Sequence, residues 1–278
     1  MPEVIASDGV QIAYDAFGRR DRSPVLMIQG LGADSRGWAL QRVRFGRRHR
    51  CVAPDNRGVG RSDKPPGPYS LFQMAEDALA CLDAEGIESA HVMGASMGGV
   101  IAQIIATIAP ERVRSLTLAC TACRHHPWRR ELLADWSREV SEHGMGAMAG
   151  DALTWLVGPR VQRRFGVLLN VLGRVVLQSP PAPFVAQVEA ILAMPDAMRD
   201  ELVQIDTPTL IITGSQDALT PVGDAEELAE LIAGSRLVVV SGAAHGVMAE
   251  APNAFNDTVL RFLDEIDARD HDEVAESA

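Results

Sequence analysis

One serine, one aspartate and one histidine in this chain stand where a nucleophile, an orienting acid and a general base are expected. The segment Gly94-Ala95-Ser96-Met97-Gly98 places a serine between two glycines, after one apolar run and before another. This G-x-S-x-G pattern is typical of a sharp strand-to-helix turn that exposes the serine hydroxyl. Small flanking residues are needed there because the strained chain passes close to itself. The pattern predicts that Ser96 is a nucleophile, and the simpler alternative is an inert glycine-rich turn.

A serine hydroxyl is a weak nucleophile, so this interpretation requires a base and an acid. In such an architecture the order along the chain is Ser, then Asp or Glu, then His, on loops after later strands. Of the seven histidines, only His245 follows the last expected strand on a loop of small residues. Asp217 follows the preceding expected strand, whereas Asp206 comes before that strand, at the wrong end of the sheet. We predict a catalytic triad of Ser96, Asp217 and His245.

Two backbone N–H groups are expected to bind the oxyanion that forms when the serine attacks an acyl carbon. One belongs to Met97, and the other to Leu31 in the glycine-containing loop 29–38. Five residues are expected to line the substrate pocket: Gln29, Gly30, Trp128, Trp155 and Val247. For the two tryptophans, packing within their own helical segment is an equally good interpretation.

Alternating strands and helices are expected to position these side chains. Apolar runs predict strands over 10–18, 24–30, 50–55, 89–95, 113–120, 207–214 and 236–242. Helical spacing predicts helices over 70–86, 97–109, 225–234 and 253–266. This alternation is typical of an α/β fold with a mostly parallel central sheet and helices on both faces.

Two segments depart from that alternation. Residues 124–200 have helical periodicity and no convincing strand, which predicts a helical lid inserted into a core of residues 1–123 and 201–266. Residues 267–278 are acidic and almost without large apolar side chains. Such a composition cannot bury enough apolar surface to fold, so a disordered tail is expected there.

Composition and charge narrow the classes of partner and compartment. The formal net charge of −11 disfavours binding to nucleic acid or to an anionic membrane. A secretory signal would be apolar near the start of the chain, where this sequence has Glu3 and Asp8. The apolar stretch 100–109 is far shorter than the roughly 20 residues that span a bilayer. Four cysteines in apolar contexts favour free thiols. We expect a cytoplasmic protein without cofactor or metal, and the sequence leaves open whether it forms homo-oligomers.

The motifs resemble those of the alpha/beta-hydrolase superfamily over about residues 10–123 and 203–266. "DNRGVGRSDKP" at 55–65 resembles its Asp-x-Arg-Gly-x-Gly-x-Ser segment. "DALACLDAEGIESAHVMGASMGG", "APERVRSLTLACTA" and "GAAHGVMAEAPNAF" are most similar to segments of 3-oxoadipate enol-lactonases and related small-ester hydrolases. The resemblance implies a serine hydrolase that cleaves small esters or (enol-)lactones through an acyl-enzyme on Ser96. Many members carry His-Gly where this chain has Gln29-Gly30.

Two other functions are compatible with the same residues. A cofactor-free perhydrolase of the haloperoxidase type uses the same triad, and a receptor-like ligand-binding protein of this fold keeps the triad with little turnover. Dehalogenases and epoxide hydrolases that resemble this fold carry an aspartate at the position of Ser96, so the sequence disfavours them.

Overall fold

The computed structural model describes residues 2–166, 180–195 and 198–276, with the backbone alone at 149, 151–153 and 271–276. In this part of the chain eight strands form one sheet in the order β1-β2-β4-β3-β5-β6-β7-β8. The strands are β1 (Glu3–Ile5), β2 (Gln11–Gly18), β3 (Pro24–Ile28), β4 (Arg50–Pro54), β5 (Ala90–Ala95), β6 (Val113–Ala119), β7 (Thr209–Gly214) and β8 (Arg236–Val240). The β1–β2 and β2–β4 pairs are antiparallel and the others are parallel. The predicted α/β fold with a mostly parallel sheet is confirmed.

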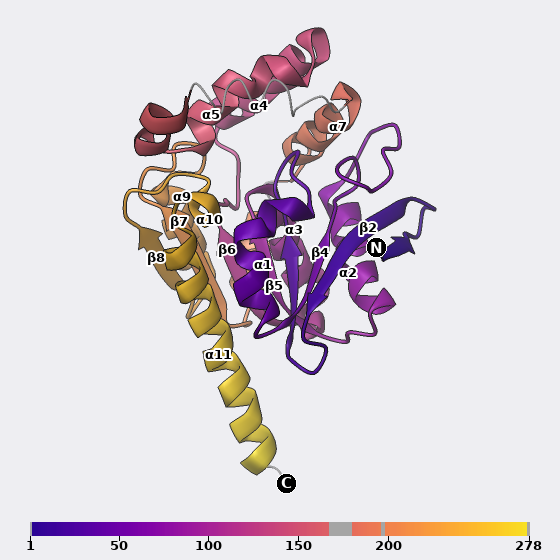
Figure 1. Ribbon diagram of the computed structural model, residues 1–278, viewed down its shortest axis with the longest axis vertical. Helices are drawn as coiled ribbons and strands as arrows, with labels where there is room; N and C mark the ends of the chain where they lie inside the picture. Colours follow the sequence, from indigo (N-terminus) through magenta and orange to yellow (C-terminus); the bar gives the residue numbers. More distant parts are fainter. Residues whose placement is uncertain (1, 167–179, 196–197, 277–278) are drawn as a thin grey trace.

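Helices cover both faces of this sheet (Figure 1). Helices α2 (Leu71–Ala84), α3 (Met97–Ile108) and α9 (Val222–Leu231) belong to one apolar cluster, and the C-terminal helix α11 (Pro252–Glu276) belongs to the other. Helices α1 (Ala39–Gly46) and α10 (Val247–Glu250) contact α11. Side chains of a strand point alternately to the two faces, so Leu26 and Ile28 join the first cluster and Val25 and Met27 the second.

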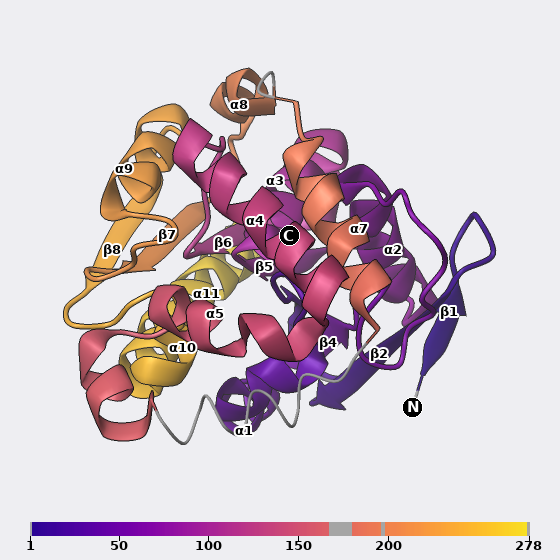
Figure 2. The same cartoon turned by 90° about the horizontal axis from the view of Figure 1, so that it is seen from above.

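The described part of the segment between β6 and β7 is mainly helical and contains no strand. It includes α4 (Pro127–His143), α5 (Ala149–Leu156), α7 (Pro181–Leu192) and α8 (Met198–Glu201), and a further helical run covers residues 159–166. Helices α4 and α7 lie side by side above the sheet (Figures 1 and 2). Their inner side chains share a cavity with residues that follow β5 and β8, so these helices cover the carboxyl ends of the parallel strands. Residues 167–179 and 196–197 of the predicted lid lie outside the described residues.

The C-terminal helix corrects one expectation. Helix α11 continues to Glu276, so the expectation of a disordered segment at 267–278 is wrong for the residues that the structure describes. Asp267 accepts hydrogen bonds from His91 and Arg114, which supply the favourable contacts that composition alone did not reveal. Residues 277–278 lie outside the described residues. Although α11 is long, no described helix is both long and apolar enough to cross a membrane.

Candidate active site

Ser96 occupies a strained turn between β5 and α3. Its backbone has a positive φ of 54° and a ψ of −120°, a conformation that a non-glycine residue adopts at a cost of about 1–3 kcal/mol. A Cβ atom on Gly94 would lie 2.0 Å from the carbonyl oxygen of Gly98, and one on Gly98 would lie 2.3 Å from that of Ile28. The two glycines therefore allow the close approach of strand, turn and helix that raises the Ser96 hydroxyl from the sheet.

Loops after three different strands bring Ser96, His245 and Asp217 together. The Ser96 Oγ atom lies 3.0 Å from His245 Nε2, and His245 Nδ1 lies 2.9 Å from Asp217 Oδ2. With the proton on Nδ1, the imidazole donates to the carboxylate and accepts from the serine hydroxyl. The three residues that the sequence singled out thus form one continuous hydrogen-bonded chain, with the geometry of a nucleophile, a base and an orienting acid.

Asp217 is buried but well supplied with hydrogen-bond donors. Its side chain accepts from the backbone N–H groups of Leu219 (3.0 Å) and Thr220 (2.8 Å) and from the Thr220 hydroxyl (2.7 Å). Burial by itself raises the pKa of Asp217, but the charge and hydrogen bond of His245 and the bonds from Thr220 outweigh it and lower that pKa. Asp217 therefore stays ionised beside the imidazole. Sequence reasoning missed Thr220, although its place three residues after the acid is a usable signal.

Leu31 and Met97, whose N–H groups are the predicted oxyanion donors, line the same cavity as Ser96. Neither donates a hydrogen bond to another residue in the described ranges. Loop 29–38 also approaches the nucleophile closely, since a Cβ atom on Gly30 would lie 3.1 Å from Ser96 Cβ. Two unengaged N–H groups beside a nucleophile are what a developing oxyanion requires.

A buried glutamine of the lid helix α7 holds this loop. Gln187 Oε1 accepts a 2.9 Å hydrogen bond from the Gly32 N–H, and Gln187 Nε2 donates a 2.9 Å hydrogen bond to the Arg57 carbonyl. The side chain is fully buried, and its bond to the Arg57 carbonyl is buried, whereas its bond to the Gly32 N–H is partly buried. Gln187 thus connects the lid to the residue that follows Leu31. No pattern in the sequence pointed to it.

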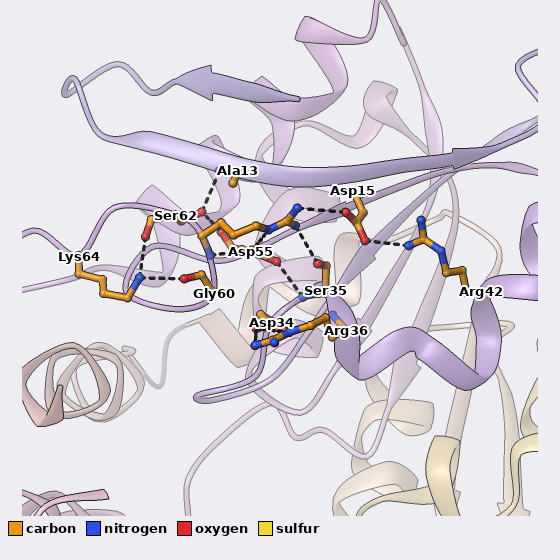
Figure 3. A network of polar contacts seen from close by, with 11 residues as sticks. Ala13, Asp15, Asp34, Ser35, Arg36, Arg42, Asp55, Gly60, Ser62 and Lys64 are labelled. Atoms are coloured by element: carbon orange, nitrogen blue, oxygen red, sulfur yellow. Dashed lines mark hydrogen bonds and ion pairs between the residues drawn. The ribbon is translucent and has the colours of Figure 1, made fainter. Parts of the chain in front are cut away.

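Asp55 holds the other end of the same loop (Figure 3). Its Oδ1 accepts from the Ser35 N–H at 2.9 Å, and its Oδ2 accepts from the Arg61 backbone N–H at 2.9 Å and from Arg61 Nε at 3.0 Å. Arg61 also contacts Asp15, which pairs with Arg42. Burial raises the pKa of Asp55, but the hydrogen bonds from Arg61 and Ser35 prevail and lower it. The Asp-x-Arg-Gly-x-Gly-x-Ser segment is therefore an anchor for loop 29–38.

A cavity of about 260 Å³ adjoins the nucleophile. Gln29 and Gly30 line it, as the sequence predicted, but Trp128, Trp155 and Val247 do not, and for these three the prediction is wrong. Trp128 and Trp155 stack on each other with centroids 6.0 Å apart, and Val247 is buried in the apolar cluster of α11. Helix α4 instead presents its face of i, i+4 and i+7 positions to the cavity: Arg129, Leu133 and Trp136.

Two groups of side chains in the described ranges have the composition of metal ligands. Cys120 lies with Asp217 and His245, and His126 lies with Asp224 and Glu227. In the first group the acid and the histidine bind each other, and burial raises the pKa of the Cys120 thiol. In the second, arginines pair with both carboxylates. These donors are already engaged, so we assign a metal to neither group.

Comparisons with known proteins agree with this geometry. Residues 23–173 match the family model described as alpha/beta hydrolase fold, and residues 191–274 match one described as TAP-like protein. A relative from Azorhizobium caulinodans named "Putative carbamate hydrolase RutD" is 34% identical over 88% of this chain and 92% of its own. The 3-oxoadipate enol-lactonase 2 of Acinetobacter baylyi is 31% identical over 92% of this chain and 94% of its own.

A solved structure gives the same result. The crystal structure of the enol-lactonase from Burkholderia xenovorans superposes with a TM-score of 0.87 at 29% identity and covers 94% of this chain and 99% of its own. The family model spans more than half of the chain, and the enol-lactonase and the carbamate hydrolase relative cover most of it. The chain belongs to the alpha/beta hydrolase family.

Proposed function

We propose that this protein is a serine hydrolase that cleaves small carboxylic esters or lactones through an acyl-enzyme on Ser96. The observation that carries the proposal is the unbroken chain from Ser96 Oγ through His245 to Asp217, which ends at a cavity. The names of two relatives support a hydrolase, since a carbamate and a lactone both have an acyl carbon bonded to a heteroatom that can leave.

The reaction follows from the positions of these groups. His245 Nε2 takes the hydroxyl proton as Ser96 Oγ attacks the acyl carbon, and Asp217 stabilises the resulting imidazolium. The Leu31 and Met97 N–H groups bind the oxyanion of the tetrahedral intermediate. When that intermediate collapses, His245 returns the proton to the leaving oxygen. Water then attacks the acyl-enzyme with His245 again as the base, which releases the acid and restores Ser96.

The test is multiple-turnover hydrolysis of p-nitrophenyl esters of increasing acyl length by the wild type, Ser96→Ala and Asp206→Ala. Asp206 is an exposed residue that precedes β7, so its variant is a matched control away from the site. We expect sustained turnover by the wild type and the control and its near-complete loss in Ser96→Ala. A single burst without turnover, or equal rates in all three proteins, contradicts the proposal. A burst alone indicates a receptor-like protein.

A further inference from the structure

The walls of the cavity beside Ser96 are mainly apolar. Large apolar side chains come from the lid and from the core: Leu133, Trp136, Phe184, Ile191, Val100 and Leu219. An apolar cavity of ~150 Å³ is enough for one benzene ring, so the present cavity has room for about ten non-hydrogen atoms. That is the size of a medium-length acyl chain or a small ring.

One buried arginine is the exception to this apolar lining. Among the described lining residues, Arg129 is the only arginine, lysine, aspartate or glutamate. Its guanidinium is already engaged: Nε donates to the Leu219 carbonyl at 2.8 Å, Nη1 donates to the Arg124 carbonyl at 3.0 Å, and Nη2 pairs with Asp224. The Arg129 and Asp224 side chains are only 2% and 3% exposed, so water does not screen this pair.

The Arg129–Asp224 pair removes the positive charge that an anionic substrate would need. A carboxylate that enters such a cavity loses its hydration, and it must compete with Asp224 for the same guanidinium. A neutral hydrocarbon chain in the same place gains roughly 25 cal/mol for each Å² of apolar surface removed from water.

On the basis of the hydrolase function proposed above, we propose that the acyl group of the substrate is neutral and apolar, and that Asp224 excludes anionic acyl groups by neutralising Arg129. A charge pair between the lid helix α4 and the core helix α9 thus sets the specificity of a mainly apolar pocket. The preferred substrates are esters or lactones of medium-sized hydrocarbon acids, and those with a second, free carboxylate are poor.

A pair of esters with the same shape tests the proposal. Mono-p-nitrophenyl adipate and p-nitrophenyl 6-methylheptanoate share a leaving group and a chain, and differ only in a terminal carboxylate against an isopropyl group. At pH 8 we expect the kcat/KM of the wild type to be roughly 100-fold or more higher for the neutral ester. Equal values, or a preference for the adipate, overturn the proposal.

Two variants test the part assigned to Asp224. Asp224→Asn leaves the Arg129 charge without its partner, so the preference for the neutral ester is expected to narrow by about tenfold or more. The double variant Arg129→Met/Asp224→Leu replaces the pair by apolar side chains, and its preference is expected to stay high. The two esters are compared within each protein, so a partial loss of stability cancels from the ratio. An unchanged ratio in Asp224→Asn shows that Asp224 does not set the specificity.

A binding measurement separates this proposal from the hydrolase function itself. 5-Methylhexylboronic acid and 4-carboxybutylboronic acid can bind a serine hydroxyl without turnover, and they carry the same pair of terminal groups. Tighter binding of the neutral compound, together with no hydrolysis of either ester, refutes the proposed hydrolase but supports the neutral pocket. Hydrolysis of both esters with tighter binding of the carboxylate refutes only the specificity.

Discussion

Two Ser–His–Asp chains lie at opposite ends of the sheet. One joins Ser96, His245 and Asp217 after the carboxyl ends of the strands, and the other joins Ser115, His91 and Asp267 near the amino ends of β5 and β6. In the second chain His91 Nδ1 lies 2.8 Å from Ser115 Oγ, and His91 Nε2 lies 3.1 Å from Asp267 Oδ1. The ring nitrogens exchange partners between the two chains: Nε2 faces the serine in the first and Nδ1 faces it in the second.

The difference between the chains lies in what surrounds the serine. Ser115 is a fully buried residue within β6, whereas Ser96 stands on a turn with positive φ beside a cavity and two unengaged N–H groups. Asp267 is paired with Arg114, while the partners of Asp217 are His245, Thr220 and backbone N–H groups. Of these two chains, only that of Ser96 has the space, the strained turn and the unengaged N–H groups that the proposed reaction requires.

The largest expected contrast is between Ser96→Ala and Ser115→Ala. Loss of a nucleophile in a triad costs about 10⁴- to 10⁶-fold in kcat. Ser115→Ala removes only one buried hydrogen bond, so we expect kcat within about twofold of the wild type and a loss of about 1 kcal/mol of unfolding free energy. Ester hydrolysis and urea unfolding of both variants measure the two effects. A large loss of activity in Ser115→Ala contradicts the division of roles.

The two aspartates give a smaller contrast in rate. Asp217→Asn keeps the shape but favours the wrong histidine tautomer, for which we expect about a 10⁴-fold loss in kcat. Asp267→Asn removes a charge that faces Arg114 and His91, so we expect an unchanged kcat and a loss of about 1–3 kcal/mol in unfolding free energy. Steady-state kinetics and chemical unfolding of the same preparations measure the change in kcat and the change in unfolding free energy. A stable Asp267→Asn protein with a low kcat shows that the Ser115–His91–Asp267 network affects the reaction at Ser96.

Sequence order was sufficient to predict the fold and to choose the residues that now lie together. Strands that end at the same edge of a parallel sheet place the loops that follow them side by side, so Ser96, Asp217 and His245 could be chosen without coordinates. The contribution of Gln187 had no such signal, because it depends on how α7 crosses the core. The rotation of α4 about its axis likewise determined that Trp136 rather than Trp128 faces the cavity.

The C-terminal segment shows that amino-acid composition alone does not predict whether a segment is ordered. Its acidic residues suggest solvation, but Asp267 and Asp270 both pair with Arg114, which lies some 150 positions earlier. Such partners become neighbours only after the sheet and α11 have packed. Burial of Phe262, Leu263 and Ile266 brings the helix to that place. Local composition therefore failed where long-range charge pairs stabilise a helix.

His49, which is linked through Ser23 to Asp267 of the Ser115–His91–Asp267 network, is expected to make stability depend on pH. His49 is buried, its Nδ1 contacts Ser23 Oγ, and its Nε2 has no hydrogen-bond partner in the described structure. Burial, with the nearby His91, lowers the pKa of His49 to about 4. The unfolded chain takes up this proton near pH 6.5 and the folded chain only near 4, so stability falls as the pH falls between these values. We expect a loss of about 3 kcal/mol from this group.

Urea unfolding of the wild type and His49→Phe at pH 7 and pH 4 measures that contribution. The phenyl ring fills similar space but cannot be protonated, so the variant is expected to lose about 3 kcal/mol less than the wild type over this range. Burial raises the pKa of Asp267, but the hydrogen bonds from His91 and Ser23 outweigh it and lower that pKa. Asp267 therefore adds a further loss of unfolding free energy mainly below about pH 3.8, and it does so in both proteins. Equal losses in the two proteins would place the acid sensitivity elsewhere.

The smallest expected effect concerns the contact between the lid helix α7 and loop 29–38. The Ser115–His91–Asp267 network has no such contact in the described structure. Gln187→Leu removes the hydrogen bonds to the Gly32 N–H and the Arg57 carbonyl, so the Leu31 N–H is held less firmly beside Ser96. Because oxyanion donors act only in the transition state, we expect kcat to fall about tenfold. Gln187 does not line the cavity, so KM should change little.

An exposed glutamine and a conservative variant serve as the controls for that measurement. Gln204→Leu makes the same substitution on an exposed residue of the short turn before β7 and should leave both constants unchanged. Gln187→Glu keeps an acceptor for the Gly32 N–H and should recover part of kcat if that bond is the one that matters. A rise in KM at constant kcat would instead mean that α7 shapes the pocket and does not position the oxyanion loop.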